Sequence, residues 1–427
     1  MRVSSAIFRA ATALLLVLCL AGSSGAYSVL THEQIVDLVW LDHIRPMLLQ
    51  RFPGATEDQL RHAHAHAYGG ALIQDMGYYP FGNRYFSDLT HYVRSGDFVV
   101  TLVRDAQDLN EYAFALGALS HCAADIMGHP AVNAAVAERF PKLRAKYGPI
   151  VTYEDDPKSH IRTEFGFDVV QVANNRYSSD AYHDFIGFEV AKPLLERAFR
   201  DTYGIELTDI FNSEDRTIGS YRWAVSTIIP KMTKVALVTR EKQMVKEYPT
   251  FERKKFLYYL SRAQYEHEWG NNYQRPGFGT RLLAFLLKLV PRVGPFKATK
   301  ITDPTPQTEQ QYLKSVNASV ERMVALLHDT DAGRLRLENR DFDTGKLTRP
   351  GEYELTDKAY ATLLHKLAGR NFDLLTAALR DNILQFYGDL KGDFATKKKP
   401  DDWKELVANL ERLRSAQATQ NAQKSSE

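Results

Sequence analysis

The chain has 427 residues, of which 25% are charged and 44% hydrophobic, the composition of an ordinary folded globular protein. Its formal net charge is +2 at pH 7, which gives no overall attraction to nucleic acid. The length suggests one large domain or two.

Residues 1–26 are predicted to be a secretory signal. Arg2 and Arg9 supply its positive region, an apolar run follows, and Ser24-Gly25-Ala26 is a small-residue cleavage site. The apolar run is too short to span a bilayer. Cleavage after Ala26 would make Tyr27 the first residue of a secreted or periplasmic protein.

Cleavage would also change the charge and the cysteine count. Two arginines leave with the signal, so the mature net charge becomes +2 − 2 = 0. Cys19 leaves as well, so Cys122 has no partner for an internal disulfide. Stability is therefore expected to come from the core or from metals.

The mature chain is predicted to begin with a helix. Thr31 and Gln34 have capping-box spacing, which places His32 in the first turn. Further on, residues 62–66 read His-Ala-His-Ala-His, where only His62 and His66 would share a helical face. This run is predicted to be a solvated surface patch and not a metal site.

Two polar residues follow in separate segments. Asp75 closes an apolar helical stretch and precedes a turn rich in glycine, proline and asparagine. His91 is predicted near the start of the next helix. Alone, Asp75 is typical of a helix terminator.

The segment 117–130 is small and apolar except for His121, Asp125 and His129. Residues four apart lie on one helical face, so these side chains are expected to point the same way. A buried carboxylate is costly unless it is paired or bound to metal. The segment alone leaves a buried His–Asp hydrogen bond and a metal site equally open.

A second helix repeats the pattern. Residues 141–157 are loop-like, and Ser159 is a plausible N-cap for a helix carrying His160, Glu164 and Asp168 at i, i+4 and i+8. Imidazoles and carboxylates in this combination suit zinc.

Residues of about 27–190 resemble the zinc-dependent phospholipase C family, which includes a bacterial phospholipase C and the N-terminal domain of glycosylphosphatidylinositol-specific phospholipase D. The resemblance is carried by Tyr27-Ser-Val-Leu-Thr-His32, by the interval from Asp75 to His91, by Ser-His121-Cys-Ala-Ala-Asp125-Ile-Met-Gly-His129, and by His160-Ile-Arg-Thr-Glu164-Phe-Gly. It implies an all-α fold with three zinc ions in a cleft.

The resemblance also implies the ligands. One zinc would be held by Asp75, His91, His121 and Asp125. A second would be held by His129, His160 and Glu164. A third would take the amine and carbonyl of Tyr27, together with His32 and the shared Asp125. Asp75 is the candidate for accepting or steering the proton of the attacking water.

One position departs from the family's usual pattern, and two others differ between its branches. Tyr27 stands where the family usually has Trp, which backbone ligation tolerates. The short spacing of Asp125 and His129 resembles the phospholipase D-type branch, whereas Glu164 agrees with the bacterial phospholipases. The two branches are mixed, which leaves the bond cleaved open.

The C-terminal half is predicted to be mostly helical, without a recognisable catalytic motif. Helices are expected at 317–327 and 372–390, loops at 328–356, and a polar tail from 397. His267 is interpreted as part of a structural polar cluster. The apolar stretch 280–293 is interpreted as a core helix, with an interfacial membrane anchor as the alternative.

The sequence thus predicts an all-α protein with a signal at 1–26, a catalytic domain at 27–250, a helical extension at 251–395 and a partly disordered tail at 396–427. Its predicted activity is zinc-dependent hydrolysis of phosphate esters, most simply by a phospholipase C acting on phospholipid, with no nucleic-acid partner. The alternatives are a zinc-dependent single-strand nuclease, a phospholipase D-type enzyme and a non-catalytic, zinc-stabilised binding protein.

Overall fold

The computed structural model describes residues 28–173, 187–225, 302 and 304–418, and this part of the chain is helical. It contains no β-strand, only an isolated bridge between Arg340 and Leu347. The predicted all-α fold is confirmed. The first group of elements comprises α2 (Val29–Val39), η1 (Trp40–Ile44), α3 (Arg45–Arg51), α4 (Glu57–Gly70), η2 (Ile73–Tyr78), α5 (Arg84–Tyr92), α6 (Ser95–Asp105), α7 (Leu109–Arg139), α8 (Pro141–Tyr147) and α9 (Pro157–Ala173).

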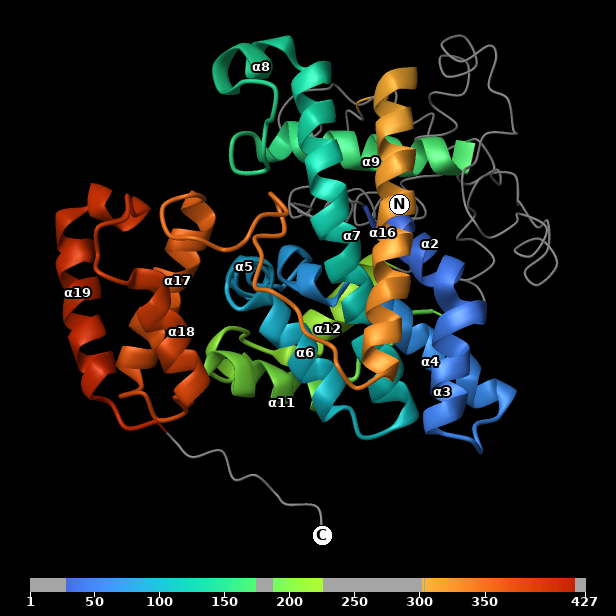
Figure 1. Cartoon of the computed structure of the whole chain (residues 1–427), viewed down its shortest axis with the longest axis horizontal. Helices are drawn as coiled ribbons and strands as arrows, with labels where there is room; N and C mark the ends of the chain where they lie inside the picture. The colour runs from blue at the N-terminus through green and yellow to red at the C-terminus, as the bar shows by residue number, and fades with distance from the viewer. Residues whose placement is uncertain (1–27, 174–186, 226–301, 303, 419–427) are drawn as a thin grey trace, which may run out of the picture.

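The later elements extend this helical body. They are α11 (Lys192–Tyr203), η3 (Leu207–Asp209), α12 (Glu214–Trp223), α16 (Pro306–Asp331), α17 (Glu354–Gly369), α18 (Ala377–Tyr387), η6 (Ala395–Lys398) and α19 (Pro400–Ser415). Helices α17, α18 and α19 pack as a small group at one end of the molecule (Figure 1).

The long helix α7 is the centre of the body. Asp108 caps its start by accepting hydrogen bonds from the backbone N–H groups of Asn110 and Glu111. Helix α4 crosses α7 very closely: a Cβ on Gly70 would lie 1.9 Å from the carbonyl oxygen of Phe114. Likewise, a Cβ on Gly117 would lie 2.0 Å from the carbonyl oxygen of Ala67. Only glycine allows this approach.

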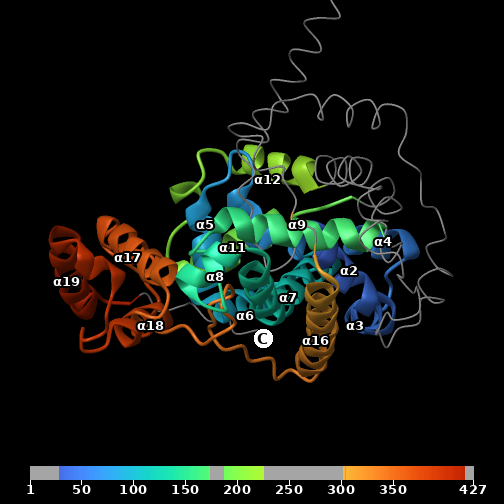
Figure 2. The same ribbon diagram turned by 90° about the horizontal axis from the view of Figure 1, so that it is seen from above.

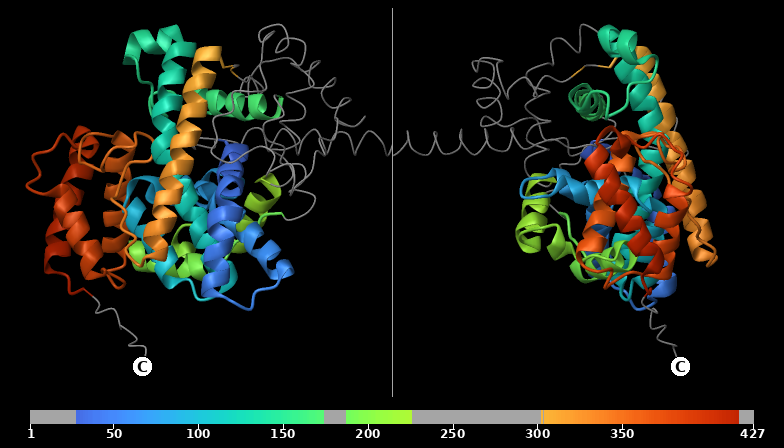
Figure 3. Two further views of the ribbon diagram at one scale, coloured as in Figure 1. Left: turned by 45° about the vertical axis from the view of Figure 1, so that its right-hand side comes forward. Right: turned by 90° about the vertical axis from the view of Figure 1, so that its left-hand side faces the viewer.

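Helix α16 runs beside α7, although some 170 residues separate them in the sequence (Figures 1 and 3). It also reaches the start of the described chain, where the Tyr312 hydroxyl contacts that of Thr31. Figure 2 shows α9 running crosswise past α7 and α2, and it contacts both helices. Helices α2, α5 and α9 therefore lie around α7, and α16 packs against α7 and α2.

Several local predictions are confirmed and others are wrong. The helix at 317–327 exists within α16, but the helix predicted at 372–390 is shorter, because Thr376 caps α18 and residues 371 and 372 have positive φ. The residues predicted as a tail contain helix α19, whose leucines 406, 410 and 413 are buried.

Three expected helix starts also differ. Thr31 does not cap α2, which begins at Val29, because its hydroxyl donates to Asp168 Oδ1 instead. Ser159 does not cap α9 either, since its own N–H is held by Asp156 Oδ1. His91 lies in the last turn of α5 and not near its start.

The histidine run is only partly at the surface. His62 is exposed, but His64 is buried, stacks on Trp40 with ring centroids 3.7 Å apart, and places Nε2 3.0 Å from Asp37 Oδ1. The prediction of a solvated patch is therefore wrong for His64. The environment of His64 is that of a core residue.

Some predictions fall outside the described residues: the signal sequence, Tyr27, His267 and the stretch 280–293. Within the described residues, no helix is long and apolar enough to cross a bilayer. Cys122 is buried and forms no disulfide with any residue that the structure describes.

Candidate metal centre

Three groups of buried side chains gather metal-type ligand atoms within 4.8 Å of one another. The first is His32, His121 and Asp125, from α2 and α7. The second joins Asp75 and His91, from η2 and α5, to the same His121. The third is His129, His160 and Glu164, from α7 and α9. These are the only such groups among the described residues, and five elements of the fold supply them.

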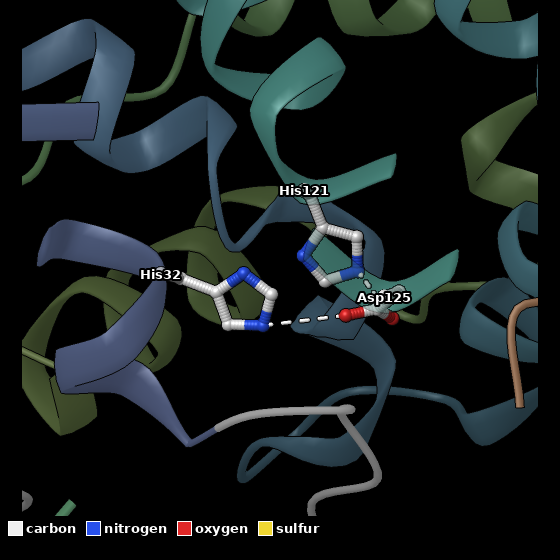
Figure 4. Close-up of side chains that lie close together, drawn as sticks. All are labelled: His32, His121 and Asp125. Carbon is white, nitrogen blue, oxygen red and sulfur yellow. Dashed lines mark ion pairs between the residues drawn. The ribbon is translucent and has the colours of Figure 1, made fainter. Parts of the chain in front are cut away.

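The Asp125 carboxylate lies at the middle of the assembly. Its Oδ1 is 3.4 Å from His32 Nε2. Its Oδ2 is 3.1 Å from His121 Nε2, 3.4 Å from His91 Nε2 and 3.6 Å from His129 Nε2. Figure 4 shows the His32 and His121 rings approaching this carboxylate from two different helices. One oxygen thus faces α2 and the other faces the remaining imidazoles.

These separations fit donors that share a metal ion. An N···O hydrogen bond is about 2.7–3.2 Å long. Two atoms bound at about 2.1 Å to a tetrahedral zinc lie ~3.4 Å apart. His91 Nε2 is 3.4 Å from Asp75 Oδ1 and 3.4 Å from His121 Nε2, where two ring nitrogens face each other. Most of the distances therefore match a shared ion better than direct hydrogen bonds.

The backbone fixes which ring nitrogen faces inward. His121 Nδ1 lies 2.9 Å from the carbonyl oxygen of Ala71, and His91 Nδ1 lies 2.8 Å from that of Ser87. An Nδ1–H donating to a carbonyl leaves the Nε2 lone pair for a metal. The peptide chain thereby orients both rings towards Asp125 and Asp75.

The side chains of the third group lack hydrogen bonds from the rest of the chain that the structure describes. The His129 and His160 rings stack with centroids 5.3 Å apart, and His160 Nε2 is 2.8 Å from Glu164 Oε1. Neither ring nitrogen of His129 or His160 forms a hydrogen bond within the described structure, and neither does Glu164 Oε1. Buried polar atoms are rarely left in this state. A cation bound between them would satisfy all three residues.

Comparison with known proteins places this assembly in a family. Residues 31–213 match the family model described as zinc dependent phospholipase C. This segment belongs to the zinc-dependent phospholipase C family. No curated protein matches the chain, and neither does any solved structure. All three side-chain groups lie within the matched segment.

The eight described residues that the resemblance implied as zinc ligands all come together in this phospholipase C segment: His32, Asp75, His91, His121, Asp125, His129, His160 and Glu164. Tyr27 lies outside the described residues. Asp168, which shares a face with His160 and Glu164, is not in a metal-type group; it accepts hydrogen bonds from Leu30 N and Thr31 Oγ1 at the start of α2.

The electrostatics of the buried donors also suit metal binding. Burial lowers the pKa of His32 to about 3 and that of His160 to about 4, which keeps both rings neutral and able to donate a lone pair. Burial raises the pKa of Glu164 well above its usual value. Burial alone would also raise the pKa of Asp125. The imidazoles of His121, His129 and His91 instead hold this pKa well below its usual value.

Two tyrosines connect the groups within the family segment. Tyr78 lies 6.1 Å from His91 between ring centroids, Tyr153 lies 5.8 Å from His160, and the two tyrosine rings are 6.5 Å apart. The half-exposed guanidinium of Arg84 lies over Tyr153, 5.4 Å from its centroid. A cation is thus placed beside the candidate centre of this phospholipase C segment.

One acidic residue beside the centre was missed by sequence reasoning. Asp343 is fully buried, and its Oδ1 is 3.4 Å from His129 Nε2. It lies in the loop between α16 and α17, outside the segment that matches the family. No helical spacing marks it, so no signal in the sequence could have found it.

Proposed function

We propose that this protein is a zinc-dependent phospholipase C that hydrolyses phospholipid headgroups with a metal-activated water. The family segment and its metal-type groups fit a zinc hydrolase. The observation that carries the finer proposal is the Asp125 carboxylate, whose Oδ1 faces His32 of the first group and whose Oδ2 faces His91 of the second. Such a carboxylate suits a bridge between neighbouring ions.

The proposed ligands are those implied by the resemblance. Asp75, His91, His121 and Asp125 would hold one ion, His129, His160 and Glu164 a second, and Tyr27, His32 and Asp125 a third. Zinc at these positions would neutralise the phosphodiester and lower the pKa of a bound water to about 7.

The protein's own groups hold and steer the reactants. Asp75 Oδ1 has no hydrogen-bond partner among the described residues and faces His91, which supports a role in accepting or directing the proton of the attacking water. Arg84, which pairs with Asp88 and lies over the Tyr153 ring, would add a donor for an anionic headgroup. No side-chain nucleophile is required.

The substrate class, location and domain division belong to the same proposal. The family description supports a lipid substrate. Residues 1–26 would direct secretion, 27–250 would form the catalytic domain, and 251–395 the extension, with the enzyme acting at a membrane surface. The hydroxyl contact between Thr31 and Tyr312 joins the proposed catalytic domain to the extension.

The test is zinc analysis of the processed protein combined with a substrate panel of phosphatidylcholine, phosphatidylinositol and single-stranded DNA. Release of diacylglycerol together with a phosphorylated headgroup is the expected result. Phosphatidic acid would indicate phospholipase D-type cleavage, and nucleotides a nuclease. Zinc without turnover of any of the three would favour a binding protein.

A matched pair of variants links the activity to the centre. His121→Ala should lose zinc and turnover together, because His121 belongs to two of the groups. His62→Ala removes an exposed imidazole from α4 and should leave both unchanged. Equal turnover in the two variants would contradict the proposed site.

A further inference from the structure

The turn of residues 79–83 joins η2 to α5, the two elements that carry Asp75 and His91. Just before the turn, the Tyr78 ring lies 6.1 Å from the His91 ring between centroids. At its tip, Phe81 has a relative exposure of 63%, the highest among the large hydrophobic side chains of the described residues. An exposed aromatic ring is thus only a few residues from groups at the candidate centre.

The exposure of Phe81 follows from a tightly held backbone. Phe81 has φ of +63°, a region that bulky residues rarely adopt and that persists only where surrounding contacts impose it. Those contacts come from α12: the Thr217 hydroxyl donates to the Phe81 carbonyl at 2.8 Å, and the Ser220 hydroxyl donates to that of Pro80. At the far end of the turn, the Asn83 side chain donates to a backbone carbonyl before α12. The fixed turn therefore presents the ring to the outside.

Helix α12 adds a second exposed ring and a cation. The Arg216 guanidinium lies over the Phe81 ring, 5.5 Å from its centroid. Residues 216, 219, 220 and 223 share one face of this helix, and Trp223 has a relative exposure of 45%. A Cβ on Gly219 would meet no atom within 4 Å, so no described part of the chain covers the face there. We call Phe81, Arg216, Gly219 and Trp223 the Phe81 surface.

The cation of the Phe81 surface is not paired with the acids beside it. Glu214 and Asp215 instead place oxygens 3.1 Å and 2.6 Å from Lys192 Nζ. Arg216 is exposed and forms no ion pair with any residue that the structure describes. Its guanidinium is therefore available to an anion such as a lipid phosphate.

The size of the Phe81 surface favours a lipid bilayer over a protein partner. Aromatic side chains bury about 150–250 Å² each when fully covered. The two partly exposed rings therefore offer far less than the ~800 Å² per partner of a standard protein interface. A bilayer requires only that such rings enter the boundary of headgroups and acyl chains while basic residues stay among the headgroups.

We propose that the Phe81 surface docks on a phospholipid bilayer, with the Phe81 and Trp223 rings at the acyl chains and Arg216 at the lipid phosphates. The inference rests on the proposed phospholipase C function and names the part of the chain that meets the aggregated substrate. Because the turn joins η2 to α5, docking brings the bilayer to the elements that carry Asp75 and His91.

The test is co-sedimentation of the protein with phosphatidylcholine vesicles, measured in the cold before lipid is hydrolysed. Phe81→Gly should weaken binding by about tenfold, the size expected for burying the exposed part of one phenylalanine ring. Its melting temperature should stay near that of wild type, because glycine suits a φ of +63°. Trp223→Ala should also weaken binding. Leu347→Ala is the matched control, since Leu347 is an exposed residue whose neighbour Thr348 bonds to the other end of α5, and its binding should equal that of wild type.

A second variant tests the cation. On vesicles that also contain phosphatidylglycerol, Arg216→Gln should bind about fivefold more weakly than wild type, the contribution of one basic residue at an anionic surface. Unchanged vesicle binding in both Phe81→Gly and Arg216→Gln, or an equal loss in Leu347→Ala, would overturn the proposal. A dimer of the wild-type protein that Phe81→Gly dissociates would assign the surface to a second copy of the chain and overturn it as well.

Hydrolysis measurements separate this proposal from the proposed function. In Phe81→Gly, turnover of vesicles should fall together with binding, whereas turnover of a monomeric short-chain phosphatidylcholine should fall by less. Wild-type protein that turns over monomers, but whose vesicle binding does not depend on Phe81, would overturn the docking surface alone. Vesicle binding that depends on Phe81, without release of any headgroup, would support the surface and contradict the phospholipase C function.

Discussion

Replacing Asp125 by asparagine tests the shared carboxylate directly. Asparagine has nearly the same shape but carries no charge and only one acceptor oxygen. Oδ1 faces His32 while Oδ2 faces His91 and His121, so the change affects two of the proposed ions. His32→Gln is the matched comparison, because the His32 ring faces Asp125 through Oδ1 alone and serves one ion.

The expected sizes follow from the number of ions affected. If each affected ion binds about 100-fold more weakly, the free energy of unfolding falls by about 2.7 kcal/mol for His32→Gln and by about 5.5 kcal/mol for Asp125→Asn. The structure describes roughly 300 residues, whose unfolding entropy is about 0.6 kcal/mol per kelvin at 2.1 cal/mol/K each. The melting temperature should therefore fall by roughly 4 °C and 9 °C.

The assay is thermal unfolding in a fixed free-zinc buffer, with zinc per chain measured on the same samples. Asp125→Asn should lose more zinc than His32→Gln, and its extra loss of melting temperature should vanish when both proteins are stripped of metal. Equal shifts in the two variants, or a full zinc count in Asp125→Asn, would refute the bridging position.

The remaining predictions concern residues around the centre. His64→Ala should keep all zinc but lose roughly 2–4 kcal/mol of stability, because the ring is stacked in the core; a drop in zinc count would argue against that role. A glycine added before Tyr27 should cost one zinc of three, because an amide nitrogen is a poor ligand, whereas Tyr27→Trp should keep all three by metal analysis. Burial raises the pKa of Asp168 from 3.8 to about 7, so the folded state holds this proton more tightly than the unfolded chain. Stability of the zinc-stripped protein should then fall as pH rises from about 4 to about 7, and denaturant unfolding of Asp168→Asn should show a smaller fall; equal slopes would contradict this.

The helical ligand pairs were predictable because local geometry determines them. His121 with Asp125, and His160 with Glu164, lie four residues apart, and the helix alone puts each pair on one face. The buried leucines of α19 have the same kind of spacing, at 406, 410 and 413, so the polar surroundings obscured a readable signal.

Other features depend on contacts that no local pattern contains. His64 looked like a surface residue, because the alternating run gives no sign that Trp40 and Asp37 meet it from the preceding helices. Asp343 lies in an aperiodic loop, and its position depends on hydrogen bonds with Tyr92 and Asn133. Such tertiary placements are decided by packing between distant segments.

The bond between Tyr92 and Asp343 spans 251 residues, which bears on how the protein is made. A chain synthesised from its N-terminus completes all the candidate ligands of the family segment by residue 164, but reaches Asp343 only after four-fifths of its 427 residues. Until then the contacts of the loop that carries Asp343 with α5 and α7 cannot form. Closing so long a segment is slow compared with forming local helices. The contacts of Asp343 with Tyr92 and Asn133 can therefore form only late in synthesis, after every candidate ligand has been made.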